Sequence, residues 1–169
     1  MTQAPAEEAV LGVRAEVTSE VPPETATFAV TVRAVAGDRA DALRRLSQRN
    51  EAVRAVLDGH GPAIERRETA GVLVHPRVKG SGEKVTGYHA SVTTTVTVGD
   101  FAALGELMLR LADGDQVTVA GPGWGLRPDS PAYRDARADA VRQALARGHE
   151  YAGTLGVTLL GLVSLSDTG

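Results

Sequence analysis

The chain has 169 residues, 43% of them hydrophobic and 23% charged, which is the size and composition of a folded globular domain. Its net charge of −3 comes from 21 acidic and 18 basic residues mixed along the sequence, so nucleic acid is not expected as a partner. Aromatic residues make up 4% and cysteine is absent. Few stacking platforms for single-stranded nucleic acid can form, and thiolate nucleophiles and disulfides are excluded.

The N-terminus is predicted to be a disordered segment over residues 1–9, followed by a single domain over residues 10–169. Glu7 and Glu8 without a basic residue, and no apolar run of signal-peptide length, predict that the chain as given is cytoplasmic. Removal of a leader would instead indicate a periplasmic or extracellular protein. No run approaches the roughly 20 apolar residues that cross a bilayer, so we expect no transmembrane segment.

The first third of the chain predicts two strands and a helix. The strands cover residues 10–17 and 25–36, and the two prolines between them oppose regular structure. The second strand alternates between an apolar row and a polar row: Phe28, Val30 and Val32 against Thr27, Thr31 and Arg33. From Asp38, which suits an N-cap, to about Gly59 the period becomes helical. The apolar stripe of this helix is Leu43, Leu46, Val53, Val56 and Leu57.

Asn50 falls within the apolar stripe of this helix, between Leu46 and Val53. A buried amide there needs a hydrogen-bonding partner, whereas an amide at the edge of the stripe is simply solvated. The sequence leaves both interpretations open.

The middle of the chain predicts a hairpin with arms over residues 64–78 and 84–98 and a glycine-containing turn at 80–83. The second arm alternates clearly, with Thr94 interrupting its inward row. Simple pairing around this turn places His75 opposite Tyr88 and His89 opposite Val74. The two imidazoles are then expected on opposite faces of the sheet, as diagonal neighbours.

The last third predicts two helices and two strands. A helix begins after Asp100 and ends near Gly114, with Leu104, Met108 and Leu111 on its stripe. A strand over 116–120 leads into the glycine-rich run 121–125. A long helix begins at Ser130-Pro131 and ends at Leu155, and residues 157–165, apolar on both faces, predict a buried strand. The inner stripe of the long helix is expected at Ala136, Ala140, Val141, Ala144 and Leu145.

The resulting order is β-β-α-β-β-α-β-α-β. Helices that interleave with hairpins predict an α+β fold with a largely antiparallel sheet and the helices packed on one face.

The sequence contains no grouping that indicates catalysis. The four histidines lack metal-ligand spacing, no serine lies in a nucleophile elbow, and the glycine runs lack phosphate-loop spacing. We therefore expect no catalytic, cofactor-binding or metal-binding residues and no cofactor. The candidate interface or ligand-contact residues are Trp124, His75, Tyr88, His89 and Asn50. For Trp124, the single tryptophan, a core position is favoured over an exposed anchor at a subunit interface.

The order of these motifs resembles the SIMPL domain family from about residue 10 to the end of the chain. The similarity is carried by separated pieces: the strand 25–35 after Pro22-Pro23-Glu24, the helix with Asn50, Glu68-Thr69 before Val74-His75-Pro76, Gly87-Tyr88-His89-Ala90-Ser91, and the terminal run from Ala136-Arg137 to Gly161. The resemblance implies an α+β domain with oligomeric assemblies, frequent export in bacteria, roles in stress protection or the cell envelope, and no established catalytic site. It supplies no functional residues.

The leading hypothesis is a non-enzymatic module that acts by homo-oligomeric assembly or protein binding, through its threonine-rich sheet faces or an open sheet edge. The chain stops at Asp167-Thr168-Gly169, where members of the family that it resembles commonly continue into another strand. Either the chain is trimmed or this member lacks that strand, and the second case is expected to leave a sheet edge exposed for pairing. The alternative is a small-ligand-binding protein, or an enzyme whose site forms between subunits, with His75, Tyr88 and His89 as its first candidates.

Overall fold

The computed structural model describes residues 9–79 and 84–167, and the chain forms two compact units. We call residues 22–128 the central unit, and residues 9–21 together with 129–167 the terminal unit. The predicted disordered segment lies almost wholly outside the described residues. That residues 10–169 fold as one domain stays a prediction.

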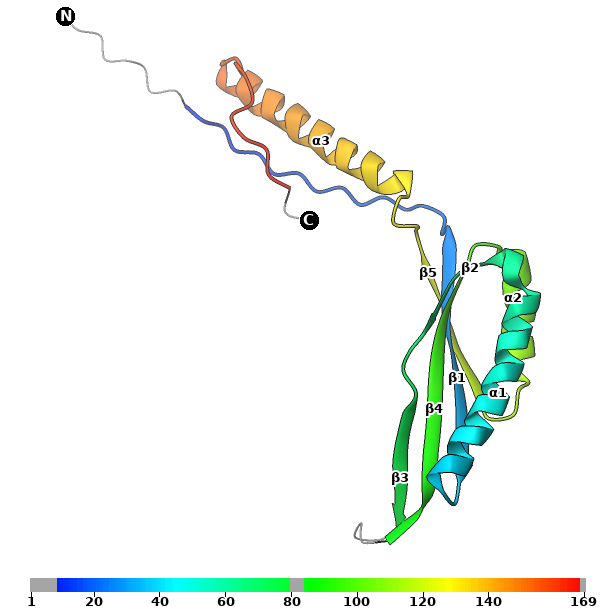
Figure 1. The fold of residues 1–169 in the computed structure, drawn as a ribbon. Coiled ribbons are helices and arrows are strands. Elements are labelled where there is room, and N and C mark those ends of the chain that lie inside the picture. Colours follow the sequence, from blue (N-terminus) through cyan, green and yellow to red (C-terminus); the bar gives the residue numbers. More distant parts are fainter. Residues whose placement is uncertain (1–8, 80–83, 168–169) are drawn as a thin grey trace, which may run out of the picture. The chain divides into compact units, whose positions relative to one another are not determined.

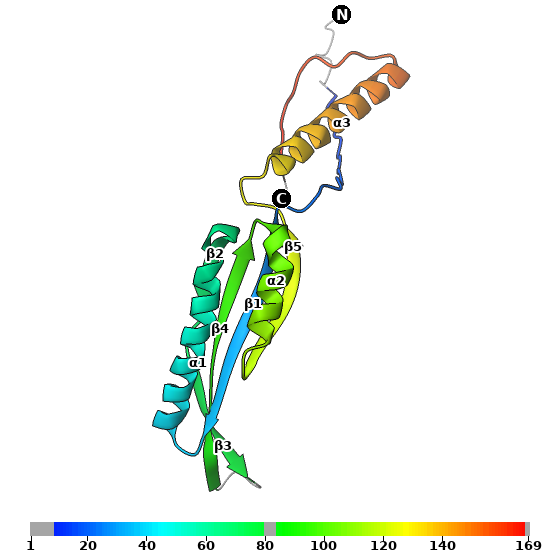
Figure 2. The same cartoon turned by 90° about the vertical axis from the view of Figure 1, so that its right-hand side faces the viewer.

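The central unit is a five-stranded antiparallel sheet with two helices on one face (Figures 1 and 2). The strand order is β2-β4-β1-β5, and β3 also pairs with β4. The strands are β1 (Thr25–Ala36), β2 (Ile64–Thr69), β3 (Leu73–Lys79), β4 (Lys84–Val98) and β5 (Val117–Gly125). The helices are α1 (Arg39–Gly59), a 3-10 turn (Gly61–Ala63) and α2 (Phe101–Ala112). The α+β class and the antiparallel sheet are confirmed.

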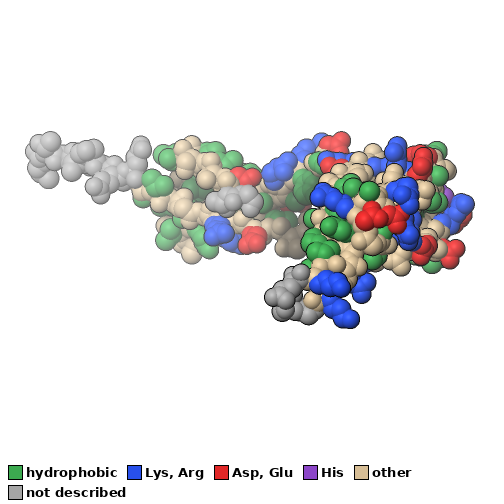
Figure 3. All heavy atoms as spheres, turned by 60° about the horizontal axis from the view of Figure 1, so that its bottom comes forward, with side chains coloured by type: hydrophobic (Ala, Val, Ile, Leu, Met, Phe, Trp, Pro, Cys, Tyr) green, Lys and Arg blue, Asp and Glu red, His purple; other side chains and the backbone are tan. Residues whose placement is uncertain are grey.

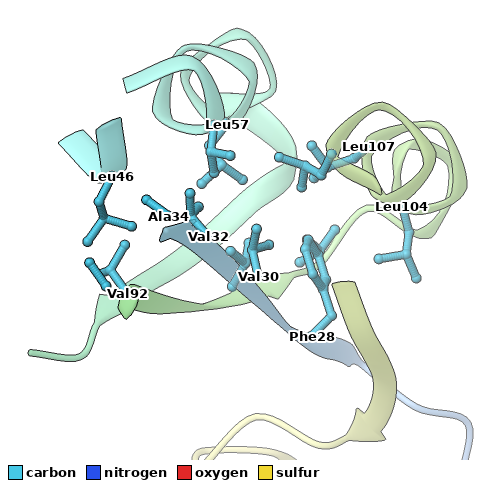
Figure 4. Packing of buried hydrophobic residues seen from close by; sticks show 14 of the residues in the cluster. Phe28, Val30, Val32, Ala34, Leu46, Leu57, Val92, Leu104 and Leu107 are labelled. Atoms are coloured by element: carbon cyan, nitrogen blue, oxygen red, sulfur yellow. The ribbon is translucent and has the colours of Figure 1, made fainter. Parts of the chain in front are cut away.

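The core lies between the sheet and the two helices. Phe28, Val30 and Val32, in the inward row of β1, are each 1% exposed, and they face Leu57 of α1 and Leu107 of α2 (Figure 4). This is the alternation that the sequence predicted for residues 25–36. Because each inward side chain packs against a helix, the period of two along the strand fixes which face is covered.

Both helices begin at the predicted caps. An Asp38 carboxylate oxygen accepts a hydrogen bond from the Asp41 backbone N–H at 2.8 Å, and Asp100 accepts one from Ala102 at 2.9 Å. One residue of the predicted α1 stripe is wrong: Leu43 is exposed, and the adjacent Ala42 is fully buried in its place. A small side chain at position 42 lets the first turn of α1 approach the sheet closely.

The opposite face of the sheet is threonine-rich, as predicted. Thr27 and Thr97 join through their hydroxyls at 3.2 Å, and Thr31 and Thr93 do so at 2.9 Å. Such cross-strand pairs satisfy polar groups without a covering helix.

The glycine-rich run 121–125 was predicted to follow a short strand, but it lies inside β5, which pairs with β1 as far as Gly125. The ladder shifts between Thr27 and Ala29 to accommodate it. A Cβ at Gly121 would lie 2.9 Å from the Cβ of Phe28, so the close approach of the two strands needs glycine there. The predicted arm over 64–78 likewise divides into β2 and β3, which both pair with β4.

The hairpin register differs from the prediction by one residue. Lys79 pairs with Lys84, but a bulge follows, and Arg77 then pairs with Gly87 and His75 with His89. The expected turn at 80–83 lies outside the described residues. The extra residue, Thr86, donates its hydroxyl to the Arg77 carbonyl at 3.1 Å. A one-residue bulge moves every later residue to a new partner, which periodicity alone does not reveal.

The terminal unit contains α3 (Pro131–Leu155), whose bounds match the prediction. The Ser130 hydroxyl accepts a hydrogen bond from the Ala132 N–H, and Gly156 ends the helix in the left-handed region with φ 67°. Residues 9–21 and 157–167 run without regular secondary structure, and both lie against the same helix. The predicted strands at 10–17 and 157–165 are therefore wrong for a single chain, since neither finds a ladder partner among the described residues.

Gly87 offers a test of the close approach between β4 and the end of β1. Its φ is 156°, and a Cβ there would lie 2.6 Å from the backbone oxygen of Ala36. We expect Gly87→Ala to lower the free energy of unfolding by about 1–3 kcal/mol, measured by urea denaturation. Gly105→Ala in α2 is the matched control, because a Cβ there meets open space and should stabilise by about 0.5–1 kcal/mol. Equal stabilities for the two variants would contradict this close approach of the Ala36 carbonyl to Gly87.

Candidate functional site

The structure brings His75 and His89 together, contrary to the predicted placement on opposite faces. They are direct cross-strand partners, and their rings stack with centroids 5.5 Å apart and an interplanar angle of 17°. The bulge at Thr86 is the cause, because it moves His89 into register with His75. The His75 side chain is exposed and that of His89 is half-buried.

Tyr88 and Asn50, two further candidates, do not join the histidine pair. Tyr88 lies on the inward row of β4 and packs half-buried against the core, on the face opposite to His89. Asn50 is half-buried on α1, and no buried polar side-chain atom among the described residues lacks a partner. The solvated-edge interpretation of Asn50 is therefore the one that fits.

Trp124 is not a core residue, so the favoured interpretation was wrong. Its side chain is 58% exposed and packs edge-on against Phe101, the first residue of α2, with ring centroids 5.2 Å apart. The Gly123-Trp124-Gly125 stretch lies at the end of an edge strand, where the Phe101 ring covers one side of the indole and most of its surface stays in water. Its exposure fits the alternative of an interface anchor, and that role stays a prediction.

Two features of the described residues bear on metal and ligand binding. They contain no group of three or more metal-ligating side chains. A groove of about 310 Å³ opens between α1, α2 and the start of β5 over Val53, Leu111 and Val117. Among its lining residues, Arg49 forms an ion pair with Asp115 at 2.5 Å. Basic and acidic side chains are interspersed over the face shown in Figure 3.

No helix among the described residues is long and apolar enough to cross a membrane.

The exposed apolar side chains gather on the terminal unit. Of the 22 large hydrophobic residues that are exposed among the described residues, 14 belong to this unit. We call these 14 residues the terminal apolar surface: Val10, Leu11, Val21, Tyr133, Val141, Leu145, Tyr151, Leu155, Val157, Leu159, Leu160, Leu162, Val163 and Leu165. Five of the last six are more than half exposed, with Leu160 reaching 93%.

The terminal apolar surface surrounds a small packed centre. Gly148 and Ala152 are buried on α3, and a Cβ at Gly148 would lie 3.6 Å from Leu159 and 3.8 Å from Val13. Both extended segments thus meet the same small-residue face of the helix. The Arg147 guanidinium also donates to the Arg14 carbonyl at 2.7 Å, which fixes the N-terminal segment along α3.

The sequence predicted part of this surface incorrectly. Val141 and Leu145 were expected on the buried stripe of α3 but are 38% and 50% exposed, and residues 157–165 were expected inside a sheet. The two-sided apolar character of 157–165 was the correct signal. Within the described part of the terminal unit, α3 covers one side of this segment, and most of its large apolar side chains stay exposed.

A comparison with known families decides the classification. The family model SIMPL, "Protein of unknown function (DUF541)", matches residues 11–169. The chain belongs to the SIMPL family.

Other comparisons add no argument about the function of this SIMPL chain. No curated protein matches it. It is similar to uncharacterized protein TM1266 from Thermotoga maritima, with 20% identity, 59% of this chain and 98% of that chain covered, and a TM-score of 0.28. It is also similar to "a putative amidohydrolase/peptidase" from Burkholderia cenocepacia, with 20% identity, 92% of this chain and 37% of that chain covered, and a TM-score of 0.36.

The tryptophan fluorescence of this SIMPL chain comes from Trp124 alone, since it is the single tryptophan. Its quenching therefore tests how exposed the indole is. We expect acrylamide to quench its fluorescence efficiently in dilute solution, because the indole is more than half exposed. Phe101→Ala should increase quenching further by removing the ring that covers one side. Leu109→Ala, an exposed position on the same helix, should leave quenching unchanged. Weak quenching in the wild-type chain would contradict the exposed placement.

Proposed function

We propose that this chain is a non-enzymatic assembly module that associates with copies of itself through the terminal apolar surface. The observation that carries the proposal is the concentration of exposed hydrophobic side chains on α3 and on two extended segments that lack strand partners among the described residues. Exposed apolar side chains concentrated in this way mark association sites, because their exposure to water is unfavourable.

The area of this surface supports a stable interface. Fully burying one Val or Leu side chain removes roughly 60–120 Å² from water, at about 25 cal/mol per Å². Fourteen side chains that are on average about half exposed therefore offer roughly 400–800 Å² of apolar area per chain. A standard interface buries about 800 Å² per partner, of which somewhat more than half is apolar.

The energetics support association on the same scale. Burying all of this area, roughly 400–800 Å², contributes about 10–20 kcal/mol at about 25 cal/mol per Å², against an association cost of about 4–15 kcal/mol. The hydrophobic term alone can therefore exceed the entropic cost of association, provided that most of the fourteen side chains become covered.

The chemistry of residues 157–165 favours a second copy as the partner. The segment Val-Thr-Leu-Leu-Gly-Leu-Val-Ser-Leu carries no charge, so two copies of it meet without repulsion. Its backbone groups have no ladder partner among the described residues, and strand addition would supply one. A two-fold arrangement needs only one such surface, used twice.

The second candidate function is ligand binding or catalysis at a site between subunits. The stacking of His75 on His89 is the observation in its favour. It ranks lower because Tyr88 points to the other face, and because two imidazoles near Arg77 and Arg33 form a weak site for a cation. The open threonine-rich face of the sheet is a further surface where a partner could bind.

The mass in solution tests the proposal. We expect the wild-type chain to be oligomeric by size exclusion with multi-angle light scattering, and Leu160→Asp to shift it toward monomer, because a carboxylate cannot be buried in an apolar interface without a partner. Leu109→Asp is the control, since Leu109 is exposed to 74% on α2 and lies outside the terminal apolar surface.

A wild-type monomer at every concentration would overturn the proposal. So would an oligomer that Leu160→Asp and Leu109→Asp leave equally intact, since assembly would then use another surface.

A further inference from the structure

The N-terminal extended segment has the side-chain pattern of a strand with one covered face. Val13, Ala15 and Val17 are half-buried, and they alternate with Arg14 and Glu16, which are exposed. The covered row lies on α3, where Val13 approaches Gly148. A period of two over five residues is typical of a strand in a ladder, and the segment has no ladder partner among the described residues.

One backbone edge of this segment is already occupied. The Arg14 carbonyl accepts from Arg147 on α3 at 2.7 Å. In an extended chain, successive residues direct their backbone groups to opposite edges, so the groups of Ala15 face away from that contact. The edge that carries the Ala15 N–H and C=O is the one open to pairing.

The charges of the segment suit pairing with a second copy of itself. In an antiparallel pair centred on Ala15, residue 14 of one chain lies opposite residue 16 of the other. Arg14 then faces Glu16 of the second copy, and Glu16 faces its Arg14, on the exposed side of the ladder. Opposite charges directly across an antiparallel pair are stabilising, and like charges are destabilising. No ion pair engages Arg14 or Glu16 within the described part of the chain.

We infer that two copies of this chain join by antiparallel pairing of residues 13–17 about a two-fold axis at Ala15, with reciprocal Arg14–Glu16 ion pairs. The inference rests on the proposed self-assembly and specifies its register. The same symmetry puts the α3 helices of both copies on one side of the ladder, where Val141 and Leu145 are exposed. A two-stranded ladder is marginal alone, so these apolar side chains provide most of the stabilisation.

Charge reversal tests the pairing in trans. Arg14→Glu places two carboxylates opposite each other in its own dimer, and Glu16→Arg places two guanidinium groups opposite each other. Each variant alone should dissociate about 10-fold more readily than wild type, because two attractive pairs become repulsive. Mixing the two variants in equal amounts should restore association, since both pairs of the heterodimer then join a carboxylate of one variant with a guanidinium of the other. Weight-average mass against concentration, by sedimentation equilibrium, measures all three.

The controls apply the same charge changes elsewhere. Arg54→Glu and Glu51→Arg lie on exposed positions of α1, in the central unit, and should leave the mass unchanged both alone and mixed. Circular dichroism of each variant checks that it folds.

The outcomes separate the two claims. A wild-type oligomer that neither variant weakens, or variants that weaken it without complementing each other, would overturn the register while leaving self-assembly intact. A wild-type chain that stays monomeric would overturn both. Weakening of each variant with recovery on mixing, absent in the α1 controls, is the result expected.

Discussion

The antiparallel ladder between β1 and β4 is the interaction on which the central unit depends. It runs without interruption from Ala26–Val98 to Ala36–Tyr88, and it sets one apolar row from each strand beneath the helices. The same ladder places the threonines of both strands on the other face, where their hydroxyls pair. One register thus determines the core and the open face together.

The terminal unit lacks a ladder of this kind among its described residues, and its exposure follows from that. Its helix is well capped, but the flanking segments find only the small-residue face around Gly148 and Ala152 to pack on. A helix face of this width covers the alternate residues of one segment, and the remaining apolar side chains stay in water. The central unit satisfies its strands within one chain, whereas the terminal unit, in the assembly that we propose, is completed when another chain supplies the missing partner.

Helices and strands that are marked by residues close together in the chain could be predicted from the sequence. β1, β4 and α3 have the bounds that alternation and capping residues indicated, including Ser130-Pro131 at the start of α3 and Gly156 at its end. The family resemblance was also correct, since the SIMPL model matches residues 11–169. These features depend on residues close together in the chain, which a single sequence displays directly.

The features that the sequence predicted wrongly depend on contacts between residues that are far apart in the chain. The stacking of His75 on His89 follows from a one-residue bulge that hydrophobic periodicity does not encode. Trp124 was expected in the core because aromatic residues usually are, but its strand lies at the edge of the sheet and leaves the indole mostly in water. Residues 10–17 and 157–165 have the apolar patterns of strands but no strand partner among the described residues. The pattern alone therefore predicted strands of a sheet where the structure has extended segments. These errors share one cause. Alternation along a strand shows which residues lie on each face of a sheet, but it does not show which strand pairs with which or in what register.

Hydrogen–deuterium exchange at increasing protein concentration tests most directly that a second copy completes the terminal unit. The account predicts that backbone amides of residues 10–17 and 157–165 become protected as concentration rises, while those of β1 are protected throughout, because only the terminal segments gain hydrogen-bond partners on association. Rapid exchange of both terminal segments at every concentration, in a chain whose β1 amides stay protected, would contradict it.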